Sequence, residues 1–449
     1  MKKELLEKIF KGNKNIIVNG DIASGKTKCV MFSVVEELIN KKESLMILDS
    51  KEEYINQYYN KLKESNYNVV ILNLRDLDKS EGWNPLEYPY ELYKNGDKDK
   101  AVEYIEKIGK VLFYEDSSQD PFWGITASDF FTGVCLGLFE DGTKSSEINF
   151  NSINVMFNGI EKKYGAEDYI TTYFKSKGVG SQAYTYASTT VLAPKDTKGS
   201  ILSVARQKLR VLVSREKLSH LMNKTTFDIN SICDKPTAII VIGRDENRTL
   251  NNLVTIFMEQ LYAILVDKKV SVKFNFVLDN FDIIEKSNDL IDMLGSCLSR
   301  NMKFYISTRS IDEQVSVYGS YIKKLCDEIS INGMSINMNV NNEQSSIEKN
   351  YEEIEMINSN VDFPKLSETS IELFNLEKKV NEIKNEQLSQ EFDFKPLPEL
   401  PNLPKSDFKV DDLIKQIDKR IEEIEVQEHL ENKKNSNTKC ELEQFKVED

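Results

Sequence analysis

The chain carries the stretch Gly20-Asp21-Ile22-Ala23-Ser24-Gly25-Lys26-Thr27 between an apolar run at residues 16–18 and an amphipathic stretch at residues 29–35. The β-branched run before it is typical of a buried strand, and the apolar spacing after it predicts a helix. A G-x-x-x-x-G-K-T loop between a strand and a helix is the context that a phosphate-binding loop requires. The stretch therefore predicts a nucleotide-binding fold built around residues 20–27.

The chemistry expected of this loop is local. Glycine lets the backbone turn so that successive N–H groups point at one anion, and the start of a helix adds partial positive charge. We expect all eight residues from Gly20 to Thr27 to hold the phosphates of ATP. Lys26 is expected to reach the β- and γ-phosphates as a catalytic residue, and the Thr27 hydroxyl is expected to bind Mg²⁺.

The same alternation of strand and helix continues on both sides of a long helical segment. Continuous apolar strands are expected at residues 45–49 and 69–74, and again at residues 237–242, 274–279 and 303–308. Apolar strands that alternate with helices predict a parallel sheet covered on both faces. The expected fold class is therefore α/β.

The chain divides into four segments by pattern and composition. Residues 1–84 are expected to form the first half of the P-loop nucleotide-binding domain, and residues 236–378 its second half. Helical periodicity throughout residues 85–235 predicts an all-α insertion domain between the two halves. Residues 379–449 are charged and contain a proline run, which predicts a disordered or extended tail with a short amphipathic helix at residues 410–424.

The composition excludes several classes of protein. The formal net charge is −14, so a protein that binds nucleic acid over its whole surface is excluded, and any DNA contact must come from a local patch or a channel. The six cysteines show no C-x-x-C spacing and there are two histidines, so neither a zinc site nor a disulfide framework is indicated. No apolar stretch appears long enough to span a bilayer, which predicts no transmembrane segment and a cytoplasmic location.

A second strand end supplies the expected partner of the loop. Asp279 follows an apolar strand, where a carboxylate could hold Mg²⁺ together with Thr27. A helix cap or a turn is the alternative role for such an aspartate. The next residue, where a glutamate commonly serves as base, is Asn280, whose amide can position a water molecule but cannot accept its proton at neutral pH. The nearby acids Asp282 and Glu285 could substitute for this base only if the backbone turns them inward.

Further motifs occur in a fixed order along the chain. They are Asp49-Ser50-Lys51-Glu52-Glu53-Tyr54, Gly82-Trp83-Asn84-Pro85-Leu86, Asp120-Pro121-Phe122-Trp123, Leu278-Asp279, Leu298-Ser299-Arg300-Asn301, Tyr318-Gly319 and Asp362-Phe363-Pro364-Lys365-Leu366. Together with the phosphate loop, they resemble the type IV secretion coupling proteins, the TraG-like conjugative DNA-transfer ATPases. The resemblance spans about residues 12–425, and the combination of W-N-P-L with D-P-F-W makes it specific.

This resemblance implies a RecA-like nucleotide-binding domain with an all-α insertion, assembled as a homo-hexamer around a pore, with ATP and Mg²⁺ at the site. It also implies single-stranded DNA and a relaxase as partners at a membrane secretion channel. Members usually begin with transmembrane helices, whereas here the phosphate loop starts within twenty residues of Met1. We therefore expect a form without its own anchor, cytoplasmic or peripheral at the inner face of the cell membrane, that reaches the channel through another protein.

Two site positions depart from the family pattern. The Asp–Glu pair is Asp279–Asn280, and the glutamine that senses the γ-phosphate is replaced by Arg309. Arginine also stabilises phosphoryl charge, so Arg309 stays a predicted catalytic residue beside Lys26 and Asn280. The acidic motif at Asp279–Asn280 (the Walker B motif) and the third motif, at Arg309, are thus both degenerate. Three hypotheses stay open, namely a DNA-translocating ATPase, a non-hydrolysing adaptor that recruits cargo or joins a ring of full-length relatives, and an inactive remnant.

Two further features allow both a functional and a structural interpretation. Residues 195–217 are strongly basic, which fits a DNA-facing patch or an arginine donated to a neighbouring subunit, but also a solvated helix face. The pair Phe122 and Trp123 could stack on bases, although aromatic residues beside helical apolar residues more often belong to the core. In both cases the structural interpretation is favoured.

Overall fold

A computed structural model of the chain describes residues 2–114, 120–142, 144–158, 163–164, 167–332 and 335–339. Within these ranges the strands are β1 Asn15–Asn19, β2 Ser44–Asp49, β3 Asn68–Asn73, β4 Lys163–Tyr164, β5 Glu167–Asp168, β6 Thr237–Ile242, β7 Phe274–Leu278, β8 Met302–Thr308, β9 Cys326–Asn332 and β10 Ser335–Asn339. The predicted tail at residues 379–449, its helix at 410–424 and the motif at 362–366 lie outside the described residues.

The helices associated with the large sheet are α1 Lys2–Lys11, α2 Phe32–Asn40, α3 Glu53–Glu64, α13 Asn251–Lys268, α14 Leu290–Ser296, α15 Ile311–Tyr318 and α16 Tyr321–Leu325. Short helical turns precede or follow them at η1 Thr27–Met31, η2 Leu77–Lys79, η5 Arg248–Leu250, η6 Phe281–Ile283 and η7 Leu298–Arg300. The alternation of these elements with the strands confirms the α/β fold class.

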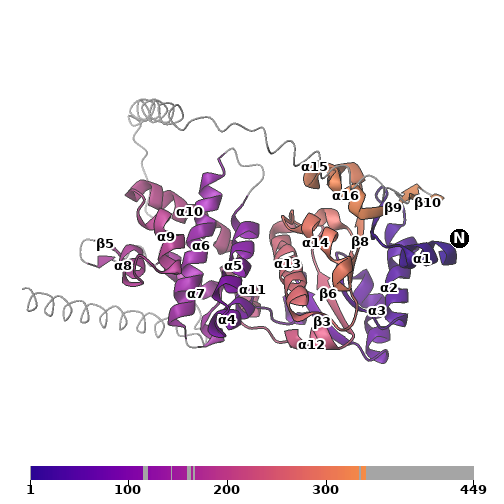
Figure 1. The fold of residues 1–449 in the computed structure, drawn as a ribbon, viewed down its shortest axis with the longest axis horizontal. Coiled ribbons are helices and arrows are strands. Elements are labelled where there is room, and N and C mark those ends of the chain that lie inside the picture. The colour runs from indigo at the N-terminus through magenta and orange to yellow at the C-terminus, as the bar shows by residue number, and fades with distance from the viewer. Residues whose placement is uncertain are drawn as a thin grey trace, which may run out of the picture. The chain divides into compact units, whose positions relative to one another are not determined.

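The strands form one sheet in the order β10-β9-β1-β8-β7-β2-β6-β3. Figure 1 labels β3, β6, β8, β9 and β10 of this sheet. Neighbouring strands pair in parallel from β9 to β3, and β10 adds an antiparallel edge. β9 and β10 were not predicted, since their polar residues interrupt the apolar runs by which the other strands were found. Because Asn19 pairs with Thr308 and Leu278 lies between Leu48 and Ile306, the loops after β1, β8, β7 and β2 leave the same edge of the sheet side by side.

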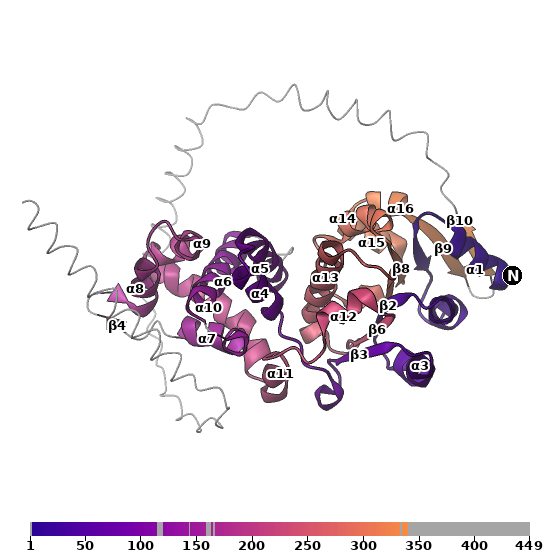
Figure 2. The ribbon, with the colours of Figure 1, turned by 60° about the horizontal axis from the view of Figure 1, so that its bottom comes forward.

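Helices cover both faces of this sheet (Figure 2). Val34, Val35 and Leu38 of α2 are buried in one apolar cluster with Ile16 and Val18 of β1. The other face packs in a second cluster that contains much of α13 and the stacked rings of Phe276 and Phe304, whose centroids are 4.5 Å apart. The strands are buried on both sides, and this is why they appear in the sequence as continuous apolar runs.

Nine helices among the described residues lie between β3 and β6. They are α4 Glu87–Lys94, α5 Lys98–Phe113, α6 Phe122–Asp141, α7 Phe150–Asn158, α8 Tyr169–Ser176, α9 Gln182–Val191, α10 Lys195–Val213, α11 Glu216–Leu221 and α12 Ile229–Asp234. A short turn at η3 Ser145–Glu147 and the two-residue strands β4 and β5 also occur in this segment, so it is helical but not strictly all-α. The domain boundaries at 84/85 and 235/236 stay predictions, because one apolar cluster runs from the sheet into the helices.

The W-N-P-L motif lies where the chain passes from the sheet to the helices. The indole Nε1 of Trp83 donates to Oε1 of Gln260 at 3.1 Å, and Nε2 of Gln260 donates to the carbonyl of Pro85 at 2.8 Å. The amide of Asn84 donates to the carbonyl of Ile148 at 2.7 Å. These buried bonds join the connection to α13 and to the helical segment, so the motif has a structural role here.

Two helices among the described residues have the length and composition to cross a membrane, namely Phe122–Asp141 and Arg248–Lys268. The apolar stretches are thus longer than the sequence analysis expected. In these two helices 72% and 78% of the apolar window is buried inside the protein. Burial in the core accounts for their composition.

Candidate functional site

A cavity of about 460 Å³ opens at the carboxyl edge of the sheet. Its lining residues come from the loops after β1, β2, β6, β7 and β8. They are Ile22, Ala23, Ser24, Gly25, Lys26, Thr27, Lys28, Lys51, Glu53, Asp245, Arg248, Asn280, Asp282, Ile283 and Arg309. Most of the predicted site residues therefore meet at one cavity, and Gly20, Asp21 and Asp279 adjoin it.

The backbone of the loop explains its two glycines. A Cβ atom on Gly20 would lie 2.7 Å from the carbonyl oxygen of Ile331 and 2.8 Å from Oγ of Ser24, so no side chain fits there. Gly25 has a φ of +93°, which side chains other than hydrogen rarely permit. The chain then enters η1 at Thr27, a π-helical turn that leads into α2. The strand, loop and helix predicted from the sequence are all present.

Lys26 folds back over its own loop. Its Nζ donates to the carbonyl oxygens of Gly20 at 2.5 Å and Asp21 at 2.9 Å, and the residue is buried. Burial lowers the pKa of this ammonium group, while the nearby carboxylates of Asp279 and Asp282 act in the opposite direction. The positive charge is thus held inside the curl of the loop, where a phosphate group is expected.

Asp279 is buried and collects hydroxyl donors from three different elements. Its Oδ2 accepts from Oγ1 of Thr27 at 2.8 Å and from the hydroxyl of Tyr54 at 2.8 Å, and its Oδ1 accepts from Oγ of Ser307. Thr27 and Asp279, the two predicted metal ligands, therefore touch directly. Neither a helix cap nor a simple turn accounts for these contacts, since the three donors come from the phosphate loop, α3 and β8.

Tyr54 and Ser307 were missed as site residues, although Tyr54 lies in the D-x-K-x-E-x segment that had been matched. In that segment, the side chain of Asp49 caps the N-terminus of helix α3. The carboxylate of Asp49 accepts from the backbone N–H groups of Glu53 at 3.0 Å, Tyr54 at 3.0 Å and Ile55 at 3.1 Å. Burial raises the pKa of Asp49, although its backbone donors counteract this effect. The cap begins α3 at the point that brings the Tyr54 ring to Asp279.

Asn280 stands in the left-handed region with a φ of 52°, which asparagine tolerates better than most residues. Its side-chain Nδ2 donates to Oγ of Ser50 at 2.8 Å, and its backbone N–H donates to Oγ of Ser307 at 3.0 Å. The residue lines the cavity, as predicted. Its side-chain NH₂ group, however, is hydrogen-bonded to Ser50, which directly follows β2. Its role in positioning water stays a prediction.

Arg309 also lines the cavity, and its partner is Asp282. Nε of Arg309 lies 3.4 Å from Oδ2 of Asp282, and the backbone N–H of Arg309 donates to the same oxygen at 2.9 Å. Asp282 was considered as a substitute base only if the backbone turned it inward, and it does line this cavity, whereas Glu285 lines a different cavity. Asp282 comes three residues after Asp279, and the turn η6 Phe281–Ile283 directs it toward the end of β8.

The basic run at residues 195–217 does not act as one surface. Lys198 is buried and contacts Asp168 at 2.9 Å, and Nε of Arg206 donates to the carbonyl of Phe157 at 2.9 Å. Lys217 pairs with Asp78. These contacts agree with the structural interpretation for three of the seven basic residues in the run.

The aromatic pair departs from the expectation of core residues. Phe122 is 41% exposed, and Trp123 is half-buried and stands edge-on to it with ring centroids 5.1 Å apart. Trp123 lines a cavity of about 840 Å³ formed with α5 and α10. The pair lies at the start of helix α6, where the side chain of Asp120 accepts the N–H of Phe122 at 3.0 Å. Both rings therefore lie at the edge of the core and not inside it.

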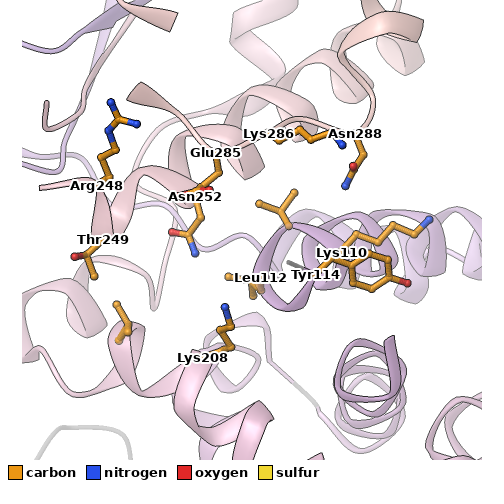
Figure 3. A pocket seen from close by; sticks show the side chains of 12 residues that line it. Lys110, Leu112, Tyr114, Lys208, Arg248, Thr249, Asn252, Glu285, Lys286 and Asn288 are labelled. Atoms are coloured by element: carbon orange, nitrogen blue, oxygen red, sulfur yellow. The ribbon is translucent and has the colours of Figure 1, made fainter. Parts of the chain in front are cut away.

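A further cavity of about 690 Å³ lies between α5, α10, η5, the start of α13 and the loop after η6 (Figure 3). Four basic residues line it, namely Lys110, Lys208, Arg248 and Lys286, and Glu285 is the acid among its lining residues. Arg248 lines both this cavity and the cavity at the phosphate loop. The two cavities are therefore neighbours that share one arginine.

Comparisons with solved structures find the bacterial conjugative coupling protein TrwB. A form in complex with sulphate is 13% identical, with a TM-score of 0.53, and the alignment covers 72% of this chain and 71% of that chain. A complex with the non-hydrolysable ATP analogue ADPNP is 12% identical, with a TM-score of 0.51 and coverage of 71% and 70%. At these identities the likeness shows the fold, a RecA-like domain interrupted by a helical domain.

A comparison at the level of the sequence gives the family. No curated protein sequence matches the chain. The family described as "Type IV secretory system Conjugative DNA transfer" matches residues 5–360, which is most of the chain. This protein therefore belongs to the type IV secretory system conjugative DNA transfer family.

Proposed function

We propose that the chain is an ATP- and Mg²⁺-binding coupling protein of a conjugative DNA-transfer system that uses ATP to translocate DNA. The observation that carries this proposal is the 2.8 Å contact between Oγ1 of Thr27 and Oδ2 of Asp279. A hydroxyl at the end of a phosphate loop and a carboxylate at the end of another strand are the two protein groups that hold Mg²⁺ in P-loop proteins.

The residues present fit both ligands. Oγ of Ser24 is buried and has no hydrogen-bond partner among the described residues, and Lys26 donates to carbonyl oxygens of its own loop. Both groups would gain an acceptor from a phosphate. Asp279, Thr27 and the hydroxyl groups around them are oxygen ligands, which Mg²⁺ prefers. When bound, the ion would neutralise phosphate charge, and Lys26, Arg309 and Arg248 would add positive charge from the protein.

Hydrolysis of ATP requires a base that accepts a proton from the attacking water molecule. A base directly after Asp279 is missing, and Asn280 can hold a water molecule but cannot take its proton. This feature supports slow turnover and keeps the second candidate, an adaptor that binds ATP without hydrolysing it. Position 280 separates the two, because Asn280→Glu should raise turnover in a motor that lacks only its base.

The partners follow from the family to which the chain belongs. We propose a homo-hexameric ring, a relaxase bound to single-stranded DNA as cargo, and a membrane secretion channel as partners. The location that we propose for the protein is the cytoplasm, at the inner face of the cell membrane. The basic lining of the second cavity supports the DNA part of the proposal, because Lys110 and Arg248 bring positive charge to a protein whose formal net charge is −14 (Figure 3).

The test is ATP turnover by the purified chain, with and without single-stranded DNA, beside Lys26→Ala. Turnover that DNA stimulates and that disappears in the Lys26 variant would support a motor. ATP binding that depends on Lys26 but gives no turnover, in the wild type and in Asn280→Glu, would favour the adaptor. Absence of ATP binding by the wild type would overturn both.

A further inference from the structure

Asp282 is surrounded by hydrogen-bond donors. Its Oδ1 accepts from Oγ1 of Thr308 at 2.5 Å and from Nε2 of Gln314 at 2.8 Å. Its Oδ2 accepts from the backbone N–H of Arg309 at 2.9 Å and lies 3.4 Å from Nε of the same residue. Its side chain is only 6% exposed although it lines the cavity at the phosphate loop.

These contacts argue against the simplest role for Asp282, a base that replaces the missing glutamate. A carboxylate offers about four lone-pair positions, and those of Asp282 face three hydrogen-bond donors and the Nε of Arg309, which makes an ion-pair contact at 3.4 Å. A water molecule in the cavity would have to displace one of them.

The same contacts fit a different role, the orientation of Arg309. A guanidinium group carries five N–H donors in a rigid plane. Nε of Arg309 faces Asp282, whereas neither terminal nitrogen of the same planar group makes a hydrogen bond within the part of the chain that the structure describes. The Arg309 side chain is 44% exposed and lines the same cavity as Lys26. Its free end is therefore available to an anion in that cavity.

Asp282 is itself held in place from two sides. Thr308 is the last residue of β8, where it pairs with Asn19 of β1 directly before the phosphate loop. Gln314 is a buried residue of α15 whose Nε2 also lies 3.2 Å from Oγ1 of Thr308. The carboxylate thus has a fixed position relative to the loop, and a fixed carboxylate can fix the arginine that it contacts.

We propose that Asp282 is a positioning residue that orients Arg309 toward the terminal phosphate, so that the site prefers a nucleoside triphosphate to a diphosphate. This inference rests on the proposed nucleotide site. It adds the residue on which discrimination between the two nucleotides depends. Arg309 is the group that touches the phosphate, and Asp282 acts through Arg309.

The charge of Asp282 gives the test a definite sign. Removal of a negative charge near the cavity, taken alone, favours the more highly charged triphosphate. Loss of the orientation of Arg309 favours neither nucleotide and so weakens binding of the triphosphate relative to the diphosphate. The two effects therefore shift the ratio of affinities in opposite directions.

The experiment measures the dissociation constants of ADPNP and ADP, each with Mg²⁺, by calorimetry on the full chain. Asp282→Asn should lower the preference for ADPNP by about tenfold, the size expected when one charge-assisted hydrogen bond is lost, and leave ADP affinity nearly unchanged. The matched control is Asp245→Asn. Asp245 lines the same cavity, but it lies 3.3 Å from Arg75 and has no role in orienting Arg309.

A second variant covers the case in which Asp282→Asn does not fold. Arg309→Lys keeps the charge but has no Nε to face Asp282, and it should show the same loss of preference. The double variant should lose no more of the preference for ADPNP than either single variant loses, because both changes break the same contact between Asp282 and Arg309.

Three results would overturn the inference. Asp282→Asn could shift the preference toward ADPNP as Asp245→Asn does, or Arg309→Lys could keep the wild-type preference. In both cases the wild type still binds nucleotide and the proposed function stands. If the wild type binds neither nucleotide, the proposed function fails and the inference fails with it.

Discussion

The hydroxyl of Tyr54 donates to Oδ2 of Asp279 at 2.8 Å, and the same oxygen accepts from Thr27 at 2.8 Å. A helix that follows β2 thereby reaches across to the end of β7 and to the phosphate loop. The Tyr54 side chain is buried, and its ring packs edge-on against Phe32 with centroids 4.9 Å apart. This tyrosine is therefore part of the support of the candidate Mg²⁺ site.

Tyr54→Phe should lower the free energy of unfolding by about 1 to 2 kcal/mol, because it leaves a buried carboxylate with one donor fewer. Urea denaturation of the chain without nucleotide measures this change. The control is Tyr59→Phe, on the same helix but 38% exposed, which should change stability little. Equal effects of the two variants would contradict a role for the Tyr54 hydroxyl.

Thr27→Ala should remove the increase in ATP affinity that Mg²⁺ produces, whereas Thr27→Ser should keep it. The serine variant keeps the hydroxyl that contacts Asp279, and the alanine variant removes it. This hydroxyl is the proposed ligand of the ion. We expect a loss of about tenfold in the Mg²⁺ effect for the alanine variant. Titrations with ADPNP, with Mg²⁺ and with a chelator, measure it. An unchanged Mg²⁺ effect in Thr27→Ala would place the ion elsewhere.

Glu259 of α13 predicts a pH dependence. The residue is buried, Oγ of Ser287 donates to it at 2.7 Å, and burial raises the pKa of its carboxyl from 4.5 to about 7. Between these two values the unfolded chain loses its proton while the folded chain keeps it, so the free energy of unfolding falls as pH rises. Above pH 7 the loss reaches about 3 kcal/mol.

Glu259→Gln removes this titration. The free energy of unfolding of this variant, relative to that of the wild type, should therefore rise from pH 4.5 to about pH 7 and then level off. Denaturation curves at several pH values measure the difference. Glu285→Gln, which changes an exposed acid on the neighbouring loop, should give no such trend. A constant difference for Glu259→Gln would contradict the prediction.

The second cavity predicts a salt dependence of DNA binding. Lys110 lines it, and a phosphate contact there releases counterions, so Lys110→Ala should reduce the slope of log affinity against log salt by about 0.7 for single-stranded DNA. Fluorescence anisotropy over a range of salt concentrations measures the slope. Lys94→Ala, an exposed lysine of α4 that does not line the cavity, is the control. The same slope in the wild type and Lys110→Ala would exclude the cavity as a DNA contact.

Local patterns in the sequence determined much of this protein. The G-x-x-x-x-G-K-T stretch specifies its own strand, loop and helix, because the glycines, the lysine and the apolar flanks act within twenty residues. The strands β2, β3, β6, β7 and β8 were predicted to within one or two residues, since strands buried on both faces are continuous apolar runs. Asp279 was found because it follows such a run.

The tertiary structure alone decided which side chains meet at the site. Tyr54 and Ser307 reach Asp279 because β7 lies between β2 and β8 in parallel register, and strand order is not encoded in any local window. Asp282 reaches Arg309 for the same reason, through the turn after β7. Contacts between residues far apart in the chain depend on how the sheet is assembled, so only the folded structure could provide them.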